Sequence, residues 1–459
     1  MKEIAAEFTT KSKEKAEDRN HRKTINFNIG KYNAVVPQGK QQFAELELAR
    51  ERAKNIKWKA IETLDSQLET FETVITRRGA QVMWAEDAND ALDIIKKICV
   101  EKNCKTLVKS KSMVTEEIHL NAFLEKNGIE SIETDLGEYI QQLAGEAPYH
   151  IVTPAMHKSK EDIAKLFAEK LGTDPSLTPE QLTLVARDVL REKYQQAEIG
   201  VTGANFIIAD IGGIAVTENE GNGRLSCSMP KTHIVIVGIE KMIPAMTDLA
   251  LFWPLLATFG TGQRITSYNT IVTGPRQPHE TDGPEEMYVI LLDNGRTNIL
   301  ANEKQRESLY CIRCGACLNA CPVYKNIGGH TYAATYSGPI GAVITPNLKD
   351  LGDWKHLSHA SSLCGNCTEV CAVKINLHEL LLENRHEAAT EGLAPYTEKM
   401  TWKMWRMAML RRGWMNMANG NMKTRAINLI GKSWTQHRGK LDFPKKSFNQ
   451  QWKEKQGAK

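Results

Sequence analysis

The sequence predicts an α/β domain, then a small cysteine-rich helical domain, then a basic helical tail. Short β-rich runs alternate with helical runs between residues 71 and 300, a pattern typical of a largely parallel sheet. Seven of the ten cysteines lie between Cys311 and Cys371. Residues 400–459 carry a net charge of +12, whereas the whole chain carries only +4. With 459 residues the chain is long enough for several domains, each with a buried core.

These shifts in composition predict four segments. They are a helical N-terminal segment (1–70), an α/β domain (71–300), a cysteine-rich domain (301–390) and a basic, Trp- and Met-rich helical region (391–459). In the first segment, apolar residues within 43–64 recur at intervals of three and four, which indicates one face of a helix.

The α/β domain is predicted element by element from its patterns. Strands are expected at 80–87, 106–110 and 131–135. Helices are expected at 89–103 and at 113–128, the second closed by Gly128. Apolar runs at 204–219, 232–241 and 287–295 read as strands buried on both faces, as parallel sheets require.

Composition also predicts the compartment. No window approaches the roughly 18 uncharged apolar residues of a membrane-spanning helix, since the longest apolar stretch, 246–259, contains Asp248 and Pro254. The first twenty residues are charged and lack the apolar segment of a secretory signal, so a cytoplasmic location is expected. Thiols stay reduced there, and clustered thiols then point to a metal rather than to disulfides.

The cysteine spacing predicts iron–sulfur clusters. The run that ends at Pro322 reads C-x2-C-x2-C-x3-C-P, the spacing with which two-cluster ferredoxins bind one cubane through three thiolates and send the fourth to the other cluster. The second run has three cysteines, and only one register uses all of them. If each run sends its last thiolate to the other cluster, cluster one is bound by Cys311, Cys314, Cys317 and Cys371. Cluster two is then bound by Cys321, Cys364 and Cys367, with Ser361 at the fourth position.

Cluster one is expected to be a 4Fe-4S cluster. Cluster two is expected to be either 3Fe-4S, or 4Fe-4S with a labile iron held by Ser361, water or a partner's group. Structural zinc is the alternative, but seven thiols do not divide into two closed four-thiolate sites. The other three cysteines, Cys99, Cys104 and Cys227, read as small buried residues.

In these motifs the chain resembles the iron–sulfur subunit, or B component, of bacterial L-lactate utilisation complexes. The resemblance rests on Lys109–Ile118, Gly200–Arg224, Pro230–Lys241, Gly262–Arg276, Leu291–Leu300, Cys311–Tyr324, Ser337–Val343 and Ser361–Cys371. It implies a lactate-utilisation (LUD) α/β domain similar to ribose-phosphate isomerase and CoA-transferase folds, followed by a two-cluster ferredoxin-like domain. It also implies oxidation of L-lactate to pyruvate together with two companion subunits, one cysteine-rich and one LUD-like. Ala372 departs from the family, which usually has proline after the last cysteine.

Two segments of the α/β domain are candidate ligand sites. Lys109, Ser110, Lys111 and Ser112 lie between a strand and a helix, where free backbone N–H groups can hold an anion. The alternative is a helix capped by Ser112 with solvated lysines. The charged, glycine-rich segment 218–224 follows a buried strand, where α/β ligand sites lie, although an ordinary turn fits equally well. No nicotinamide or flavin motif is present, and His233 is read as structural rather than as an acid or base.

The tail predicts a docking helix. It places Trp402, Trp405 and Met409 on one helical face, with Arg406 and Arg411 alongside. Packing on a companion subunit is favoured over peripheral contact with an anionic membrane, and no nucleic-acid partner is expected.

The favoured function is electron transfer through two clusters within an L-lactate-oxidising complex. The chain is then an electron carrier in a dehydrogenase-type complex rather than its sole catalytic chain. The alternatives are a stand-alone enzyme that binds a small anion beside an open cluster, and a cluster-based redox sensor.

Overall fold

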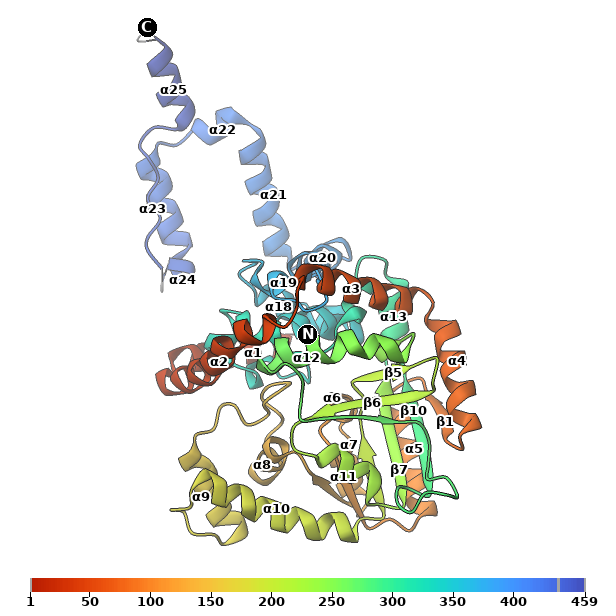
Figure 1. Cartoon of the computed structure of the whole chain (residues 1–459). Coiled ribbons are helices and arrows are strands. Elements are labelled where there is room, and N and C mark those ends of the chain that lie inside the picture. The colour runs from red at the N-terminus through yellow and green to blue at the C-terminus, as the bar shows by residue number, and fades with distance from the viewer. Residues whose placement is uncertain (1, 436–437, 458–459) are drawn as a thin grey trace. The chain divides into compact units, whose positions relative to one another are not determined.

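The computed structural model describes residues 2–435 and 438–457. The chain divides into two compact units, residues 1–388 and 389–459. The α/β part and the cysteine-rich part therefore lie in one unit (Figure 1). The finer divisions at residues 70, 300 and 390 stay predictions.

Four helices open the first unit. They are α1 (Lys2–Glu17), α2 (Arg19–Lys40), α3 (Leu46–Glu62) and α4 (Leu64–Arg77). On α4, buried residues recur every three or four positions, from Leu64 through Leu68 and Phe71 to Ile75. This apolar stripe packs against one face of the main sheet.

The main sheet has six strands, paired in parallel throughout, as the sequence predicts. They run in the order β1 (Gln81–Ala85), β10 (Glu286–Leu292), β7 (Thr232–Gly238), β4 (Ile199–Thr202), β2 (Thr106–Lys109) and β3 (Glu130–Glu133). Alternate residues of a strand enter opposite cores: Ile234 packs toward α5 (Ala88–Glu101), whereas Val235 packs toward α4. The remaining helices of this part are α8 (Leu136–Ala144), α9 (Lys160–Leu171), α10 (Pro179–Gln196) and α11 (Asn222–Ser228).

Two predicted elements differ in the structure. The helix expected at 113–128 is broken at His119, whose left-handed backbone (φ 55°) separates α6 (Met113–Glu117) from α7 (Leu120–Lys126). The run 204–219 forms two antiparallel strands, β5 (Phe206–Ile208) and β6 (Gly213–Glu218), because the chain reverses at Gly212 with φ 56°. A Cβ at Gly212 would lie 2.5 Å from the Ile75 nitrogen, so this turn requires glycine.

These strands belong to a second sheet that the sequence analysis did not predict. Its order is β8 (Met242–Ile243), β5, β6 and β9 (Tyr268–Val272). Helix α12 (Leu249–Thr261) packs on it, with Phe252 5.1 Å from Phe206 between ring centroids. One hydrophobic core then continues from this sheet into the cysteine-rich part.

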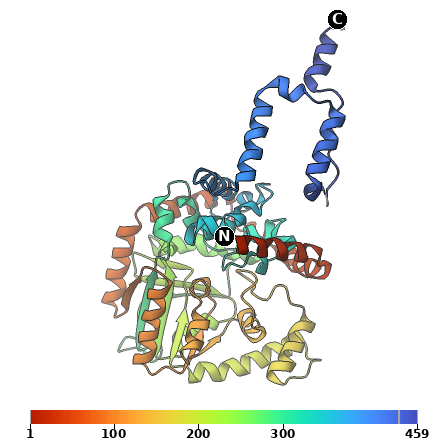
Figure 2. The same ribbon diagram turned by 180° about the vertical axis from the view of Figure 1, so that it is seen from behind.

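Short helices build the cysteine-rich part. They are α13 (Arg296–Ala301), α14 (Ala316–Ala320), α15 (Tyr324–Ile327), α16 (Gly338–Leu348), α17 (Leu351–Trp354), α18 (His356–His359), α19 (Asn366–Glu369) and α20 (Leu377–Thr390). Single turns of 3-10 helix lie at η1 (Ile239–Lys241), η2 (Met246–Asp248), η3 (Arg306–Tyr310) and η4 (His330–Tyr332). The N-terminal helices α1–α3 lie beside this part, as the reverse view shows (Figure 2).

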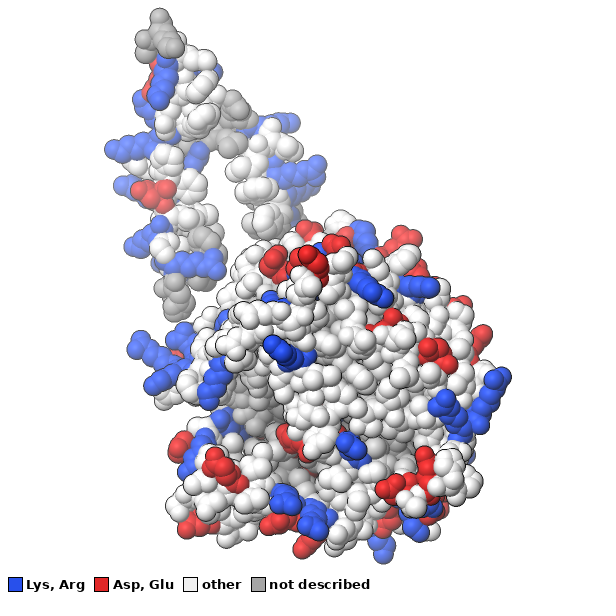
Figure 3. Space-filling model, viewed as in Figure 1, with Lys and Arg blue, Asp and Glu red and all other residues white. Residues whose placement is uncertain are grey.

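The second unit is helical. It contains α21 (Tyr396–Leu410), α22 (Arg412–Asn416), α23 (Gly420–Ile430), α24 (Lys432–Thr435) and α25 (Phe448–Gly457). Lysine and arginine side chains are prominent along it (Figure 3). On α21, Trp402 and Trp405 meet edge to face with centroids 5.7 Å apart, and each is more than half exposed. In the part of the chain that the structure describes, every helix is too short or too polar to cross a membrane.

Candidate metal centre and adjoining pocket

The cysteine-rich part gathers the seven thiols into two groups. Cys311, Cys314, Cys317 and Cys371 line one small cavity whose other walls are mostly apolar, among them Ile340 and Val373. The other group is Cys321, Cys364 and Cys367. Their proximity shows in the pKa of the Cys367 thiol, which is raised to about 11, first by burial and then by Cys321 and Cys364. The four-plus-three grouping is the one that the crossed assignment expects. Ligation itself stays a prediction.

Two glycines start the helices that present the thiols. Gly315 (φ 78°) precedes α14 and Gly365 (φ 80°) precedes α19, so each Cys-Gly-x-Cys segment passes through the left-handed region, which glycine enters at no steric cost. Backbone amides then point at sulfur. The Arg313, Tyr324 and Ile375 amides donate to the Sγ atoms of Cys311 (3.4 Å), Cys321 (3.5 Å) and Cys371 (3.3 Å).

The buried thiols suit a cationic centre. Burial and the neighbouring thiols raise the pKa of Cys314 and of Cys371 to about 12, and they also raise the pKa of Cys317 well above its ordinary value. Thiolates packed this closely in an apolar cavity repel one another unless a positive charge lies among them. Metal binding supplies that charge and displaces the thiol protons, so the donor set fits an iron–sulfur cluster.

Ser361 makes local backbone contacts. Its Oγ accepts from the Leu363 amide at 3.1 Å. The neighbouring hydroxyl, Ser362, lies beside the exposed Cys364. There the pKa of the thiol is lowered, first by the Asn366 amide and then by Ser362. Ser362 is a residue that spacing alone did not single out, because it occupies no ligand position in the motif.

Helix α3 holds the second cysteine run in place. The Arg50 guanidinium donates to the Glu369 carbonyl at 2.6 Å and to the Cys371 carbonyl at 2.8 Å. Lys54 donates to the Lys374 carbonyl at 3.2 Å. These contacts join residues more than 300 positions apart in the sequence. The helical periodicity of residues 43–64 therefore could not predict them.

The three other cysteines lie elsewhere. Cys99 and Cys104 are buried around the end of α5, as predicted, whereas Cys227 is only partly buried and donates to the Arg224 carbonyl at 3.2 Å. None of the three lines the cavity of the four thiols.

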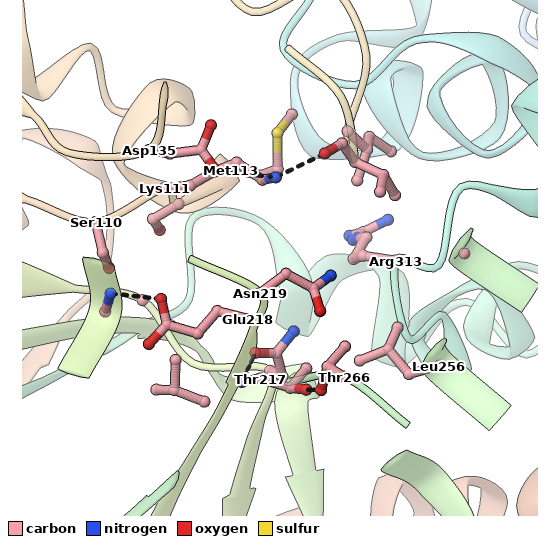
Figure 4. A pocket seen from close by; sticks show the side chains of 18 of the residues that line it. Ser110, Lys111, Met113, Asp135, Thr217, Glu218, Asn219, Leu256, Thr266 and Arg313 are labelled. Carbon is pink, nitrogen blue, oxygen red and sulfur yellow. Dashed lines mark hydrogen bonds and ion pairs between the residues drawn. The ribbon is translucent and has the colours of Figure 1, made fainter. Parts of the chain in front are cut away.

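A second, larger cavity of about 400 Å³, here called the strand-end pocket, adjoins the four-thiol cavity. It lies beyond the carboxyl ends of β2, β4 and β6, and Arg313 and Cys314 line both cavities. The structure brings both predicted ligand segments to this pocket, since Ser110–Ser112 and 218–220 face it (Figure 4).

Lys109 does not line the strand-end pocket. Its fully buried Nζ lies 2.6 Å from Glu133 and 3.1 Å from Glu116 and donates to Thr115 Oγ1 at 2.9 Å. Burial lowers the pKa of Lys109, but the neighbouring carboxylates raise it by more than burial lowers it. The net shift is therefore upward, and the ammonium stays charged in the core. Lys111 does face the pocket and is already engaged, donating to the Val152 carbonyl at 2.8 Å and lying 3.6 Å from Asp135.

Ser112 caps α6, because its Oγ accepts from the Thr115 amide at 3.4 Å. His233 is fully buried on β7, with Nε2 2.8 Å from Thr202 Oγ1. Burial lowers the pKa of His233 to about 3, so the ring is neutral. It does not line the strand-end pocket, which agrees with a structural role.

Two cations on the thiol side of the strand-end pocket were missed by the sequence analysis. Lys241 follows β7, and Arg313 lies between two cysteines of the first run. The Arg313 guanidinium packs 4.4 Å from the centroid of the Tyr336 ring, and burial and Arg313 together lower the pKa of Lys241 to about 8. The available signal was position: Lys241 follows closely after a fully buried strand, and Arg313 lies between two cysteines of the motif.

Comparisons with known proteins agree with this architecture. The LUD domain family matches residues 68–292, and the 4Fe-4S dicluster domain family matches residues 307–375. The chain is thus a LUD-domain protein that also carries a 4Fe-4S dicluster domain, with iron–sulfur clusters as its cofactor.

Proteins that are similar to this chain over most of its length identify the family. Lactate utilization protein B of Bacillus licheniformis is 48% identical over 356 residues, which is 77% of this chain and 74% of that protein. The protein of the same name from Bacillus subtilis is 47% identical, over 79% and 76% of the two chains. That of Bacillus cytotoxicus is 44% identical, over 88% of each. The chain belongs to the lactate utilization protein B family, which confirms the resemblance.

One solved structure is similar, a DUF162 family protein from Deinococcus radiodurans. It shares 16% identity, with a TM-score of 0.29, and the match covers 50% of this chain and 98% of that one.

Proposed function

We propose that this chain is the electron-transfer subunit of a complex that oxidises L-lactate to pyruvate. The observation that carries the proposal is the placement of four thiols around one cavity and three thiols in a second group. Membership of the lactate utilization protein B family supports lactate as the electron source. The likeness of the sheet domain to ribose-phosphate isomerase and CoA-transferase folds is part of the same proposal.

The residues that hold the clusters follow from this grouping. Cys311, Cys314, Cys317 and Cys371 would hold a 4Fe-4S cluster, and Cys321, Cys364 and Cys367 would hold a 4Fe-4S or 3Fe-4S cluster. Clusters of these kinds accept and donate one electron at a time. The protein contributes amide hydrogen bonds to Sγ atoms and an apolar wall that limits water, two features that tune a cluster's potential.

The fourth position of cluster two is not a thiolate in this proposal. Ser361 occupies it in the motif, with water or a partner's group as alternatives. In the group of three, Cys364 is exposed although the other two thiols are buried, whereas each thiol of the group of four is buried or partly buried. Cluster two would therefore lie nearer to solvent and is the better placed to exchange electrons with another protein.

The partners are two companion lactate-utilisation subunits, one cysteine-rich and one LUD-like, in the cytoplasm. The exposed Trp402 and Trp405 of the second unit supply apolar surface for such docking. A stand-alone enzyme is the second candidate, because the strand-end pocket shares Cys314 with the four-thiol cavity. No observation favours the redox sensor.

The test is anaerobic reduction by lactate. The cluster-loaded chain is mixed with L-lactate, with and without the two companion subunits, and cluster reduction is followed by EPR and visible absorbance. Reduction only in the presence of the companions supports the relay. Turnover by the chain alone supports the enzyme. No reduction in a complex that still oxidises lactate contradicts electron transfer through this chain.

A further inference from the structure

The strand-end pocket has a positive end, where Lys241 and Arg313 lie beside a single carboxylate, Glu240. Lys241 is 93% buried, since its exposed fraction is 7%, and it lines the pocket. Among the described residues, no carboxylate lies within ion-pair distance of its Nζ and no group accepts a hydrogen bond from it. A buried ammonium of this kind is costly unless an anion joins it.

Arg313 lies on the same side. Its Nη2 is 3.6 Å from Glu240, while its buried Nη1 has no hydrogen-bond partner among the described residues. Figure 4 shows its side chain reaching toward the pocket from the cysteine-rich part. Arg313 has a positive φ of 60° in the loop between two cysteines.

Hydrogen bonds from Lys57 fix the backbone on both sides of Lys241. Lys57 of α3 donates from Nζ to the carbonyls of Glu240 (2.5 Å) and Met242 (3.0 Å), which flank Lys241. Lys57 is itself fully buried. The ammonium of Lys241 is therefore placed by the fold rather than by a partner of its own.

The acidic side chains of the pocket already accept backbone hydrogen bonds, and Glu220 does so from the Leu136 amide at 3.0 Å. Glu218 accepts from the Gly223 and Arg224 amides at 2.6 and 2.8 Å. Asp135 accepts from the Gly137 amide at 3.0 Å and lies near Lys111. Lys241 and Arg313, by contrast, share the one neighbouring carboxylate of Glu240, so positive charge is in excess beside them.

We propose that the strand-end pocket binds a small organic carboxylate, with its carboxylate group at Lys241 and Arg313. Two cations match a single carboxylate, whereas the nearby Asp135, Glu218 and Glu220 disfavour a doubly charged phosphate. The rest of the pocket is mixed: Leu256 and Val216 are apolar, whereas Ser110 and Asn205 are polar. That lining suits a 2-hydroxy or 2-oxo acid. The choice of L-lactate and pyruvate within this class rests on the proposed function.

The position deepens the proposed function. Because Cys314 lines both cavities, a bound acid would lie next to the proposed cluster one rather than on the far side of the sheet. The inference concerns binding, and it holds whichever subunit performs the oxidation.

The test is equilibrium binding to the cluster-loaded chain without its companions, under anaerobic conditions. Isothermal titration with L-lactate and with pyruvate should give saturable binding, and lactamide, which lacks the carboxylate, should not bind. Lys241→Met should weaken binding by about 10- to 100-fold, the loss expected for one charge-assisted hydrogen bond. Lys126→Met makes the same change at an exposed lysine outside the pocket and should leave the dissociation constant unchanged.

Iron content and visible absorbance check that each variant keeps its clusters. If Lys241→Met loses them, Lys241→Gln replaces it. If both variants lose them, the wild-type chain is used instead. L-lactate should protect Lys241 of the wild-type chain from an amine-modifying reagent, and the extent of modification is measured by peptide mass spectrometry. The inference is overturned if the wild-type chain binds neither acid, if Lys241→Met binds as tightly as wild type, or if lactate gives no protection.

These outcomes separate the two proposals. Binding by the isolated chain without lactate-dependent cluster reduction in the complex would leave the carboxylate site standing and remove the relay. Cluster reduction in the complex without binding here would keep the relay and overturn the site.

Discussion

Arg296 and Glu117 form a buried bidentate ion pair, with Nη1–Oε1 and Nη2–Oε2 distances of 2.9 Å each. Arg296 Nε also donates to Glu240 at 2.5 Å, and the Tyr336 hydroxyl donates to Glu117 at 2.6 Å. The network therefore ties α6 and the turn after β7 to α13 and Tyr336 of the cysteine-rich part. It explains why two segments that composition separates form one compact unit.

Breaking this pair should destabilise the first unit strongly. Arg296→Met leaves Glu117 and Glu240 buried without their partner, and we expect a loss of about 3–5 kcal/mol in the free energy of unfolding, measured by urea denaturation. Arg306→Met removes a partly exposed pair with Glu62 and serves as the control, with an expected loss below about 1 kcal/mol. Equal effects would contradict the role assigned to burial.

Cys371→Ser should destroy cluster one and spare cluster two. Cys371 lines the cavity of the first three cysteines although it lies in the second run. Iron quantitation and EPR of the anaerobically purified variant measure the effect, with Cys227→Ser as the control. Selective loss of cluster two would show that the crossed assignment is wrong.

Air exposure should convert cluster two to a 3Fe-4S form, because its fourth position is not a thiolate. Oxidised protein should show the three-iron EPR signal, and Ser361→Cys should suppress it. If air-exposed wild type keeps the iron of two full cubanes, another ligand closes the site. Ser362→Cys then tests the hydroxyl beside Cys364.

Deleting residues 400–459 should leave both clusters intact but abolish co-purification with the companions and lactate-dependent reduction. Trp402→Ala with Trp405→Ala should weaken docking similarly, whereas Trp58→Ala, an exposed tryptophan on α3, should not. Salt should slow association more than it speeds dissociation, since exposed basic residues steer encounter. Assembly of the truncated chain would contradict docking, and liposome binding by the intact chain would favour membrane contact.

The neutral state of His233 should make the fold sensitive to acid. Its folded pKa of about 3 lies below the unfolded value near 6.5, so its contribution to stability is present above pH 6.5 and is lost as the pH falls toward 3. The slope for one group is about 1.4 kcal/mol per pH unit. Urea denaturation at pH 7.5 and 5.5 should show a smaller decrease for His233→Gln than for wild type. An equal decrease would mean that His233 is protonated in the fold.

Local pattern was sufficient for the parts of this protein whose chemistry is local. The spacing of Cys311–Cys321 specifies cluster binding because thiolates must converge on one small inorganic core. The apolar runs at 232–238 and 286–292 became central parallel strands, since both faces of such strands are buried. The break at His119 and the reversal at Gly212 escaped prediction because each depends on one residue with positive φ.

The sequence by itself determined which kinds of domain the chain contains, the family to which it belongs and the thiols that are available to bind clusters. Only the tertiary structure decided which charged residues are free to act. Lys109 and Lys111 lie two residues apart and look alike in sequence, yet the fold buries one among carboxylates and turns the other toward the strand-end pocket. Lys241 and Arg313, 72 positions apart, meet there beside one shared carboxylate, Glu240. The reason is physical: the state of a charged side chain depends on partners brought by distant segments, and no local period encodes them.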